Sequence, residues 1–243
     1  MHKNLIWRPL GYGSVKLAAL FSGGKDSTFA LSCAKKLGHH IVCVINICPM
    51  EDDSLLFHYP NSWVTVELAN AMQTPILTFT VTGRSKEAEI NALEEAVART
   101  KSLYGIEGIV HGGISSSYQK SVFDQVCTHQ NIAAIAPLWN SDPEGYMIKL
   151  VQSGFNIVIV GVSTMGLDKD WLGRELDKEA IAKLASLSKK CGFNLTFEGG
   201  EAETLVIDCP LYRKKLQINE ANTYWDGQRG IFEILDVALV EKK

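Results

Sequence analysis

Apolar and polar residues alternate along the first half of the chain in two different spacings. Apolar residues at helical spacing predict helices at 26–37, between Ser62 and Pro75, at 85–104 and at 115–130. Asn61 and Ser62 are the candidate N-caps of the second of these helices. Apolar runs of strand length predict buried strands before and between them, at 15–21, 41–47, 76–81, 108–111 and 132–136. Strands that alternate with helices of this length indicate βαβ crossovers and a parallel sheet. The pattern therefore predicts an α/β fold.

The alternation ends at Pro137-Leu138-Trp139. Beyond it the pattern predicts helices at about 142–153 and 176–190, a strand at 155–162, and short strands at 204–208, 213–218 and 231–240. We therefore expect a domain boundary near residue 138. A first domain of residues 1–137 would be followed by a smaller domain of mixed α/β or α+β structure at residues 138–243.

The turn after the first predicted strand reads Ser22-Gly23-Gly24-Lys25-Asp26-Ser27-Thr28. A helix begins inside this turn, so its first N–H groups lack intrahelical partners and the helix dipole adds positive potential. The two glycines carry no Cβ that would keep an anion at a distance. The three hydroxyls add donors and Lys25 adds a positive charge. The turn is therefore predicted to bind phosphate.

Three other interpretations of this turn are weaker. A Walker A loop needs Ser or Thr where Asp26 stands, and a first glycine where Ala19 stands. The Rossmann fingerprint is absent, because Gly11-Tyr12-Gly13 precedes the strand. A plain turn whose polar residues only cap the helix would not need six consecutive matches to one motif. The letters S-G-G-K-D-S instead resemble the PP-loop of ATP pyrophosphatases, which cleave ATP between the α- and β-phosphates.

A second Gly-Gly pair follows the fourth predicted strand. Gly112-Gly113 repeats the strand–turn–helix arrangement, and Ser115 to Ser117 supply helix caps. Ligands of parallel sheets bind outside the carboxyl ends of the strands, where this turn, the first turn and an acidic, aromatic loop at 48–59 all fall. We expect Gly112 and Gly113 to contact a nucleotide or a carboxylate. Asn46, at the end of the second strand, either borders an adenine pocket or packs in the core.

Composition narrows the class of protein. The 243 residues are 46% hydrophobic and 21% charged, and their net charge is −3. The longest basic run is Arg213-Lys214-Lys215. We therefore expect little attraction to nucleic acid or membranes. The apolar runs are far shorter than the ~20 residues of a membrane span. No signal peptide is recognised, so we expect a cytoplasmic protein with six reduced cysteines. No zinc-type spacing supports a metal site at His39, His40 and Cys43, and no metal ligands are assigned.

Further blocks make a family resemblance specific. They are Gly112-Gly113-Ile114-Ser115-Ser116-Ser117-Tyr118-Gln119-Lys120, Pro137-Leu138-Trp139, the segment 166–174 (GLDKDWLGR) and the segment 198–211 (EGGEAETLVIDCPL). Together with S-G-G-K-D-S, they make the chain similar to the diphthine–ammonia ligase family of N-type ATP pyrophosphatases, over nearly all residues beyond 15. Val122 departs from the family pattern, which often has a basic residue there, and residues 1–14 lie outside the resemblance.

The resemblance implies a HUP-type, Rossmann-like ATP-binding domain followed by a substrate domain. It also implies ATP-dependent amidation of diphthine, a modified histidine of translation elongation factor 2. ATP would activate the diphthine carboxylate as an acyl-adenylate, and ammonia would then displace AMP. Mg²⁺ and Lys25 would stabilise the charge that builds on the departing pyrophosphate. ATP, Mg²⁺, ammonium and elongation factor 2 are therefore the expected cofactors and partners.

Three groups of site residues follow from the motifs and the resemblance together. Lys25, Asp26, Glu198 and Glu201 form the catalytic group. The expected cofactor-binding residues are Ser22, Gly23, Gly24, Lys25, Asp26, Ser27, Thr28, Asn46, Gly112 and Gly113. The expected substrate-binding residues are Ser116, Tyr118, Gln119, Trp139, Glu198, Gly199, Gly200, Glu201, Glu203 and Thr204.

The acidic cluster Glu198, Glu201 and Glu203 has two interpretations. Clustered carboxylates suit ammonium and the quaternary ammonium of diphthine, to which Trp139 or Trp171 would add a cation–π face. The alternatives are a solvated acidic hairpin and tryptophans that pack in the core.

Other functions stay open beside the amide ligase. The chain could be a PP-loop enzyme that acts on another carboxylate or modifies tRNA, although its acidic balance and its lack of a C-x-x-C pair argue against the tRNA enzymes. It could also be a sensor that binds ATP without turnover, although a sensor would not need the E-G-G-E half. The oligomeric state, a homodimer included, stays open as well.

Overall fold

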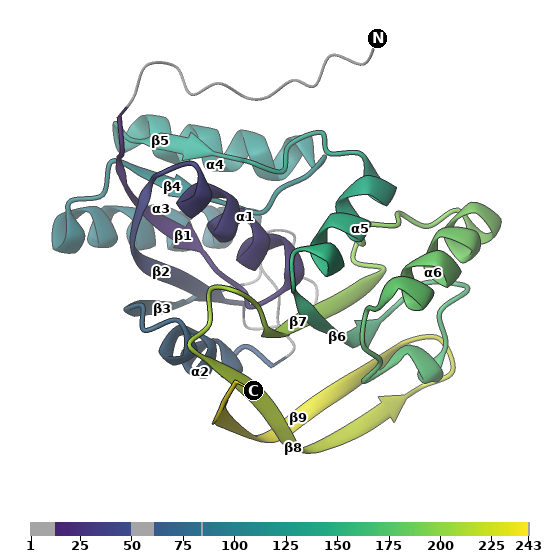
Figure 1. Ribbon diagram of the computed structural model, residues 1–243. Coiled ribbons are helices and arrows are strands. Elements are labelled where there is room, and N and C mark those ends of the chain that lie inside the picture. Colours follow the sequence, from purple (N-terminus) through teal and green to yellow (C-terminus); the bar gives the residue numbers. More distant parts are fainter. Residues whose placement is uncertain (1–12, 50–60, 84, 243) are drawn as a thin grey trace, which may run out of the picture.

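Two β-sheets of different type form the molecule, and helix α1 lies between them (Figure 1). The computed structural model describes residues 13–49, 61–83 and 85–242. Most of the predicted 48–59 loop lies outside these residues, so its expected place at the edge of the first sheet stays a prediction.

The first sheet has five parallel strands in the order β3-β2-β1-β4-β5. Its elements are β1 Lys16–Leu20, α1 Lys25–Lys36, β2 His40–Cys48, α2 Val64–Ala71, β3 Ile76–Thr80, α3 Lys86–Tyr104, β4 Gly108–Val110, α4 Ser117–His129 and β5 Ala133–Ile135. The chain leaves β1 toward β2 on one side and later adds β4 on the other. Ligands of such sheets bind at this switch point, between the loops that follow β1 and β4.

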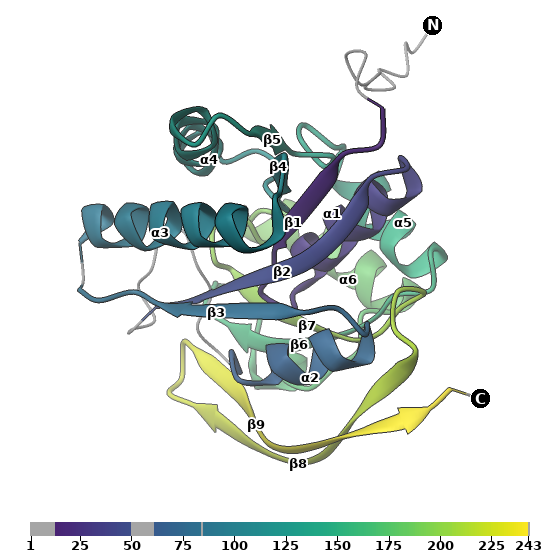
Figure 2. The ribbon, with the colours of Figure 1, turned by 90° about the vertical axis from the view of Figure 1, so that its left-hand side faces the viewer.

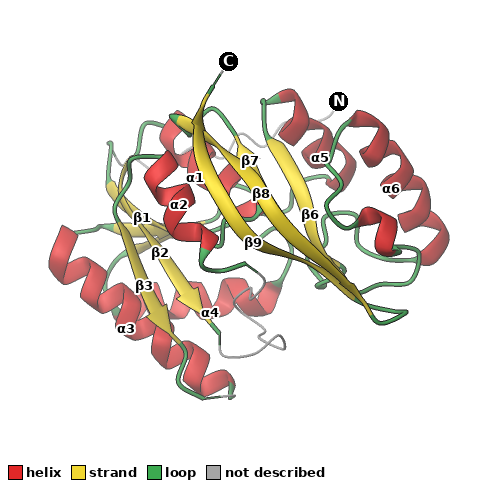
Figure 3. Cartoon of the chain, turned by 90° about the horizontal axis from the view of Figure 1, so that it is seen from below, coloured by secondary structure: helices red, strands yellow, loops and turns green. Residues whose placement is uncertain are grey.

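The second sheet has four antiparallel strands in the order β7-β6-β9-β8 (Figure 3). Its elements and their neighbours are α5 Pro143–Gln152, β6 Asn156–Val162, the short 3₁₀ helix η1 Lys169–Trp171, α6 Lys178–Cys191, β7 Ala202–Asp208, β8 Lys214–Trp225 and β9 Gly230–Glu241. A Rossmann-like parallel sheet followed by a separate antiparallel sheet with helices confirms the expected fold class.

Helices cover both faces of the first sheet. The buried residues of α3 and α4 pack with Ile45 and Ile109 on one face. On the other face, α1 and α2 pack between this sheet and the second one (Figure 2), where one core cluster extends from Phe29 of α1 to Val206 of β7. The division into domains at residue 138 stays a prediction, and the two halves share a core. None of the helices in the described residues is long and apolar enough to cross a membrane.

Two predicted details are wrong. The strand predicted at 213–218 extends to Trp225, because it pairs along its whole length with β9 although its second half is polar. Asn61, which stands where a helix cap is expected, does not cap α2. Its amide donates to Phe232 O at 3.0 Å and accepts from Ile234 N at 2.8 Å, so it ties the start of α2 to β9.

Candidate active site

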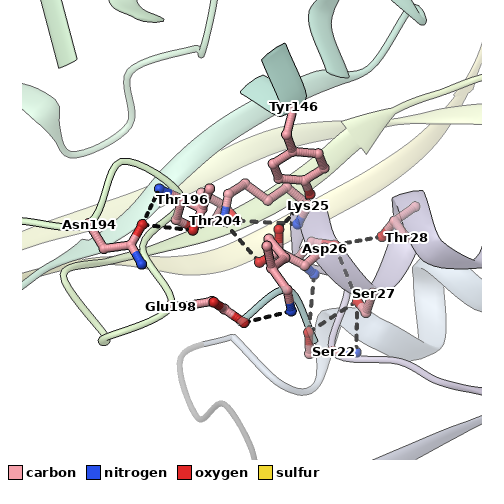
Figure 4. Close-up of polar contacts among 12 residues, drawn as sticks. Ser22, Lys25, Asp26, Ser27, Thr28, Tyr146, Asn194, Thr196, Glu198 and Thr204 are labelled. Carbon is pink, nitrogen blue, oxygen red and sulfur yellow. Dashed lines mark hydrogen bonds and ion pairs between the residues drawn. The ribbon is translucent and has the colours of Figure 1, made fainter. Parts of the chain in front are cut away.

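The Ser22–Ser27 turn connects the end of β1 to the start of α1, as predicted (Figure 4). Gly23 adopts a φ of +78°, in the left-handed region that favours glycine. The Ser22 and Ser27 hydroxyls lie 3.2 Å apart, and Thr28 Oγ1 donates to Gly24 O at 2.8 Å. The hydroxyls therefore hold the turn together. Since α1 begins at Lys25, the amides of its first turn have no intrahelical acceptor.

The same turn is bonded to β7 of the second sheet. Val206 N donates to Gly23 O at 2.9 Å. Lys25 N donates to Thr204 Oγ1 at 3.2 Å, which joins residues 179 positions apart in the chain. A Cβ on Gly24 would lie 3.2 Å from Thr204 O, closer than most Cβ contacts. Glycine at this position therefore lets β7 approach the turn closely.

The Gly112-Gly113 turn touches the first turn directly. A Cβ on Gly112 would lie 2.6 Å from the carbonyl carbon of Asp26 and 2.7 Å from Ser27 N. Both contacts involve backbone, so only glycine fits without a shift of the main chain. The two Gly-Gly turns thus lie side by side at the carboxyl ends of β1 and β4.

Lys25 and Asp26 form the centre of a buried polar network. Lys25 is 2% exposed, and its ammonium donates to Asp26 Oδ2 at 2.9 Å and to Thr196 O at 2.6 Å. It also lies 5.2 Å from the centre of the Phe197 ring. Tyr146 of α5 donates to Asp26 Oδ1 at 2.5 Å. Burial and the nearby Asp26 raise the pKa of Tyr146 well above its usual value, so its hydroxyl stays a donor.

Glu198 reaches across from the loop before β7 to the segment 114–116, which directly precedes α4. Its Oε1 accepts from Ile114 N at 2.6 Å, from Ser115 N at 2.8 Å and from Ser116 N at 3.4 Å. Its Oε2 accepts from the Ser115 hydroxyl. Successive backbone N–H groups that converge on one oxygen form an anion-binding site. These amides can therefore hold a carboxylate.

The loop at 194–201 is held in shape largely by its own side chains. Glu201 accepts from Asn194 N at 2.9 Å and from Gly199 N at 2.8 Å. Asn194 Oδ1 accepts from the amide and the hydroxyl of Thr196 at 2.9 and 2.8 Å. Phe197 has a φ of +64°, which is unusual for a bulky residue. Such conformations persist where the surroundings impose them, and they concentrate at functional sites.

A cavity opens between the two Gly-Gly turns and this loop. It encloses about 890 Å³ when the open space at its mouth is included. The residues that line it are Leu20, Phe21, Ser22, Gly24, Lys25, Asp26, Ser27, Ile45, Asn46, Ile47, His111, Gly112, Gly113, Gln119, Phe123, Phe197, Glu198, Ala202, Glu203 and Thr204.

The cavity brings together twelve of the residues expected at the site. They are Ser22, Gly24, Lys25, Asp26, Ser27, Asn46, Gly112, Gly113, Gln119, Glu198, Glu203 and Thr204. The others do not line it: Gly23, Thr28, Ser116, Tyr118, Trp139, Gly199, Gly200 and Glu201. Glu201 shapes the loop instead of facing the cavity. The functional role of each residue stays a prediction.

The two tryptophans each lie beside a cation of the chain itself, and their expected role at the substrate stays a prediction. Trp171 is 2% exposed, and its ring already lies 4.7 Å from Arg174 and 5.2 Å from Lys183. Trp139 lies 5.7 Å from Lys120 and does not line the cavity. Both rings therefore contact cations of the chain itself, as expected for the alternative in which they serve packing.

Sequence reasoning missed His111, Phe123 and Tyr146. His111 and Phe123 line the cavity, and Tyr146 bonds Asp26. The position of His111 at the end of a strand, directly before Gly112, was a usable signal. Tyr146 gives no such signal, because it lies 120 residues from its partner in an ordinary amphipathic helix.

The donor set of the cavity fits a magnesium–nucleotide complex. Among the described residues that line it, Lys25 is the one lysine or arginine, against the carboxylates of Asp26, Glu198 and Glu203. A polyphosphate would need a further cation there, and carboxylate oxygens are ligands that Mg²⁺ accepts. Among the described residues, no group of three or more His, Cys, Asp and Glu side chains is arranged to hold a metal alone. Mg²⁺ commonly binds through one or two carboxylates together with the phosphates of a substrate.

Both halves of the chain match one family. The diphthamide synthase N-terminal domain matches residues 15–134, and the diphthamide synthase C-terminal domain matches residues 142–240. The diphthine–ammonia ligase of Homo sapiens is 33% identical over 225 residues, which are 85% of this chain and 84% of that protein. The Bos taurus enzyme of the same name is 32% identical with the same coverage.

A solved structure is also similar in part. It is described as a predicted subunit of tRNA methyltransferase from Methanocaldococcus jannaschii, and it covers 81% of this chain and 98% of its own at 16% identity and a TM-score of 0.42. This likeness is too low to bear on function. The matches of both halves and of the full-length relatives confirm the resemblance seen in the motifs and the expected ligase class: the chain belongs to the diphthine–ammonia ligase, or diphthamide synthase, family.

Proposed function

We propose that this protein is an ATP-dependent amide ligase that converts diphthine to diphthamide on translation elongation factor 2. One observation carries the proposal: a PP-loop-like turn and a set of amides that holds a carboxylate meet at a single cavity. The names of the relatives support the substrate, because they are diphthine–ammonia ligases.

In the first step, the Ser22–Thr28 turn binds the phosphates of ATP. A carboxylate oxygen of the substrate attacks the α-phosphorus, the bond to the β-phosphate oxygen breaks, and pyrophosphate leaves. Lys25 exchanges its bonds to Asp26 and Thr196 for bonds to phosphate oxygens and so stabilises the leaving group. Asp26 would hold Mg²⁺, which would supply further charge neutralisation.

The amides of Ile114 to Ser116 position the substrate carboxylate. They now hold the carboxylate of Glu198, so they offer the donors that a second carboxylate needs. Because the Gly112-Gly113 turn that leads to them touches the first turn, a carboxylate bound there lies close to the bound nucleotide. Holding both reactants in one cavity converts a bimolecular reaction into a positioned one.

In the second step, ammonia attacks the carbonyl carbon of the acyl-adenylate and AMP leaves. Glu198 and Glu203 line the cavity, and their carboxylates attract ammonium. One of them accepts the proton that turns ammonium into the nucleophile ammonia. When the substrate carboxylate displaces Glu198 from the amides of Ile114 to Ser116, Glu198 would become available to accept this proton.

The test is turnover of ATP with Mg²⁺, ammonium and diphthine-bearing elongation factor 2. We expect AMP, pyrophosphate and amide in equal amounts. Lys25→Met should abolish turnover, and Lys36→Met, at the exposed end of the same helix, should not. Release of ADP would contradict the ligase mechanism. Tight ATP binding without any turnover would favour the sensor, and turnover that requires tRNA would favour a tRNA-modifying enzyme.

A further inference from the structure

His111 is a buried polar side chain that the proposed chemistry does not use. It follows β4, it is 2% exposed, and it lines the cavity. Its ring packs against Phe123, with the two centroids 4.6 Å apart. Its Nδ1 accepts from Gly113 N at 3.2 Å. Its Nε2 has no hydrogen-bond partner among the described residues.

The tautomer of His111 follows from these contacts. Since Nδ1 accepts a hydrogen bond, the proton of the neutral ring sits on Nε2. Burial lowers the pKa of His111 to about 4, against the opposing effect of Asp124, so the ring is neutral near pH 7. The two charged groups that face it, Asp124 and Lys120, pair with each other. His111 therefore presents a neutral N–H donor that lacks an acceptor, an arrangement that folded proteins usually avoid.

The part of the cavity beside His111 is apolar. Leu20, Ile45, Ile47 and Phe123 line it, and all four belong to the core cluster between the first sheet and α3 and α4. The charged residues of the cavity lie instead in the Ser22–Ser27 turn and the 197–203 segment. A flat, uncharged ring suits the apolar part, and phosphates suit the charged part.

We propose that the apolar part of the cavity holds the purine base of the nucleotide, and that His111 Nε2 donates a hydrogen bond to a ring nitrogen of that base. The inference rests on the proposed use of ATP. Adenine, the base of ATP, offers unprotonated ring nitrogens at positions 1, 3 and 7, each of which accepts one hydrogen bond. The Nε2 atom is closed off from water in the structure, so the wall of the cavity shifts slightly when a base enters.

The experiment compares ATP with its 1-deaza, 3-deaza and 7-deaza analogues, in each of which one ring nitrogen is replaced by C–H. Binding is measured by calorimetry without the carboxylate substrate, so that nothing turns over. We expect one analogue to bind the wild-type protein about 5- to 100-fold more weakly than ATP, because it leaves a buried donor unpaired. The other two analogues should bind within about threefold of ATP.

Two substitutions at His111 identify the donor. His111→Asn keeps an acceptor near the place of Nδ1 and removes the Nε2 donor, so it should bind ATP and the sensitive analogue equally. His111→Gln places an amide near the position of Nε2 and should restore part of the discrimination. The matched control is His129→Asn, because His129 is exposed and pairs with Glu94. This variant should bind ATP and the analogues as wild type does.

The outcomes separate this inference from the proposed function. If ATP binds and all three analogues bind wild type equally well, the inference is wrong and the proposed function stands. Discrimination that persists unchanged in His111→Asn also overturns it, since another group then makes the contact. If neither ATP nor any analogue binds, the proposed function fails together with the inference. The wild-type comparison holds even if a variant does not fold.

Discussion

One methyl group at Gly112 should disable the site. In Gly112→Ala the new Cβ would lie 2.6 Å from the carbonyl carbon of Asp26 and 2.7 Å from Ser27 N. Ordinary contacts begin at 3.4 Å, so the two turns have to separate by about 0.8 Å. Neither contact is with a flexible side chain that could move away. The displacement therefore falls on the backbone of the phosphate-binding turn.

The expected size of the effect follows from this displacement. Overpacking of this kind costs about 1–3 kcal/mol of folding stability. A shift approaching 1 Å in a group that positions substrate lowers turnover by about 10- to 100-fold. We therefore expect Gly112→Ala to fold, to unfold at lower urea concentration than wild type, and to release AMP 10- to 100-fold more slowly.

Two control substitutions separate stability from function. In Gly108→Ala the Cβ would lie 2.8 Å from Ala133 O, inside the sheet. This variant should therefore be less stable than wild type, and its turnover per folded molecule should be the same as that of wild type. Gly13→Ala meets nothing within 4 Å and should change neither property. Urea unfolding and AMP release are measured for all three variants. Wild-type turnover in folded Gly112→Ala would refute the claim that the contact of the two turns shapes the site.

Three further predictions concern single side chains. Tyr146→Phe should lower the free energy of unfolding in urea by about 1.5–3 kcal/mol, because the hydroxyl donates to a carboxylate. Tyr212→Phe should lower it by only about 1 kcal/mol, because that hydroxyl donates to the uncharged Val206 O. Equal losses would show that the charge of Asp26 does not strengthen the bond. Glu198→Gln should lower the free energy of unfolding by about 1–2 kcal/mol, since the amides of Ile114 and Ser115 lose a charged acceptor. An unchanged urea midpoint would count against this. Burial lowers the pKa of His111 from 6.5 to about 4, so the unfolded chain binds this proton first as the pH falls. About 3 kcal/mol of the stability present above pH 6.5 should therefore be lost between pH 6.5 and pH 4. If the stability of wild type and of His111→Asn changes in parallel over this range, His111 does not contribute.

The parts of the site that depend on local sequence could be predicted. The Ser22–Ser27 turn and the Gly112-Gly113 turn follow directly from a strand, a Gly-Gly pair and a helix. Parallel strands then bring both turns to one edge of the sheet. The sequence also showed that the segment around Glu198 is distinctive, because its motif matches the family.

The contacts made between distant segments could not be predicted. Nothing in the pattern around Tyr146 shows that it reaches Asp26, and nothing in the E-G-G-E motif shows that Glu198 faces the cavity while Glu201 bonds its own loop. Such choices depend on how two sheets pack, which periodicity does not record. The length of β8 was missed for a related reason, since pairing with β9 outweighs the weak strand preference of its polar residues.

The hydrogen bonds that join Gly23 and Lys25 to β7 predict how fragments of this enzyme behave. A fragment that ends after β5 would retain every letter of the S-G-G-K-D-S motif but lose Thr204 and Val206, which brace it. We expect that neither this fragment nor the remaining C-terminal fragment binds a nucleotide when it is produced separately. A mixture of the two fragments should bind a nucleotide only when they associate. For the same reason, exchange of the second half for an unrelated domain should change the conformation of the Ser22–Ser27 turn.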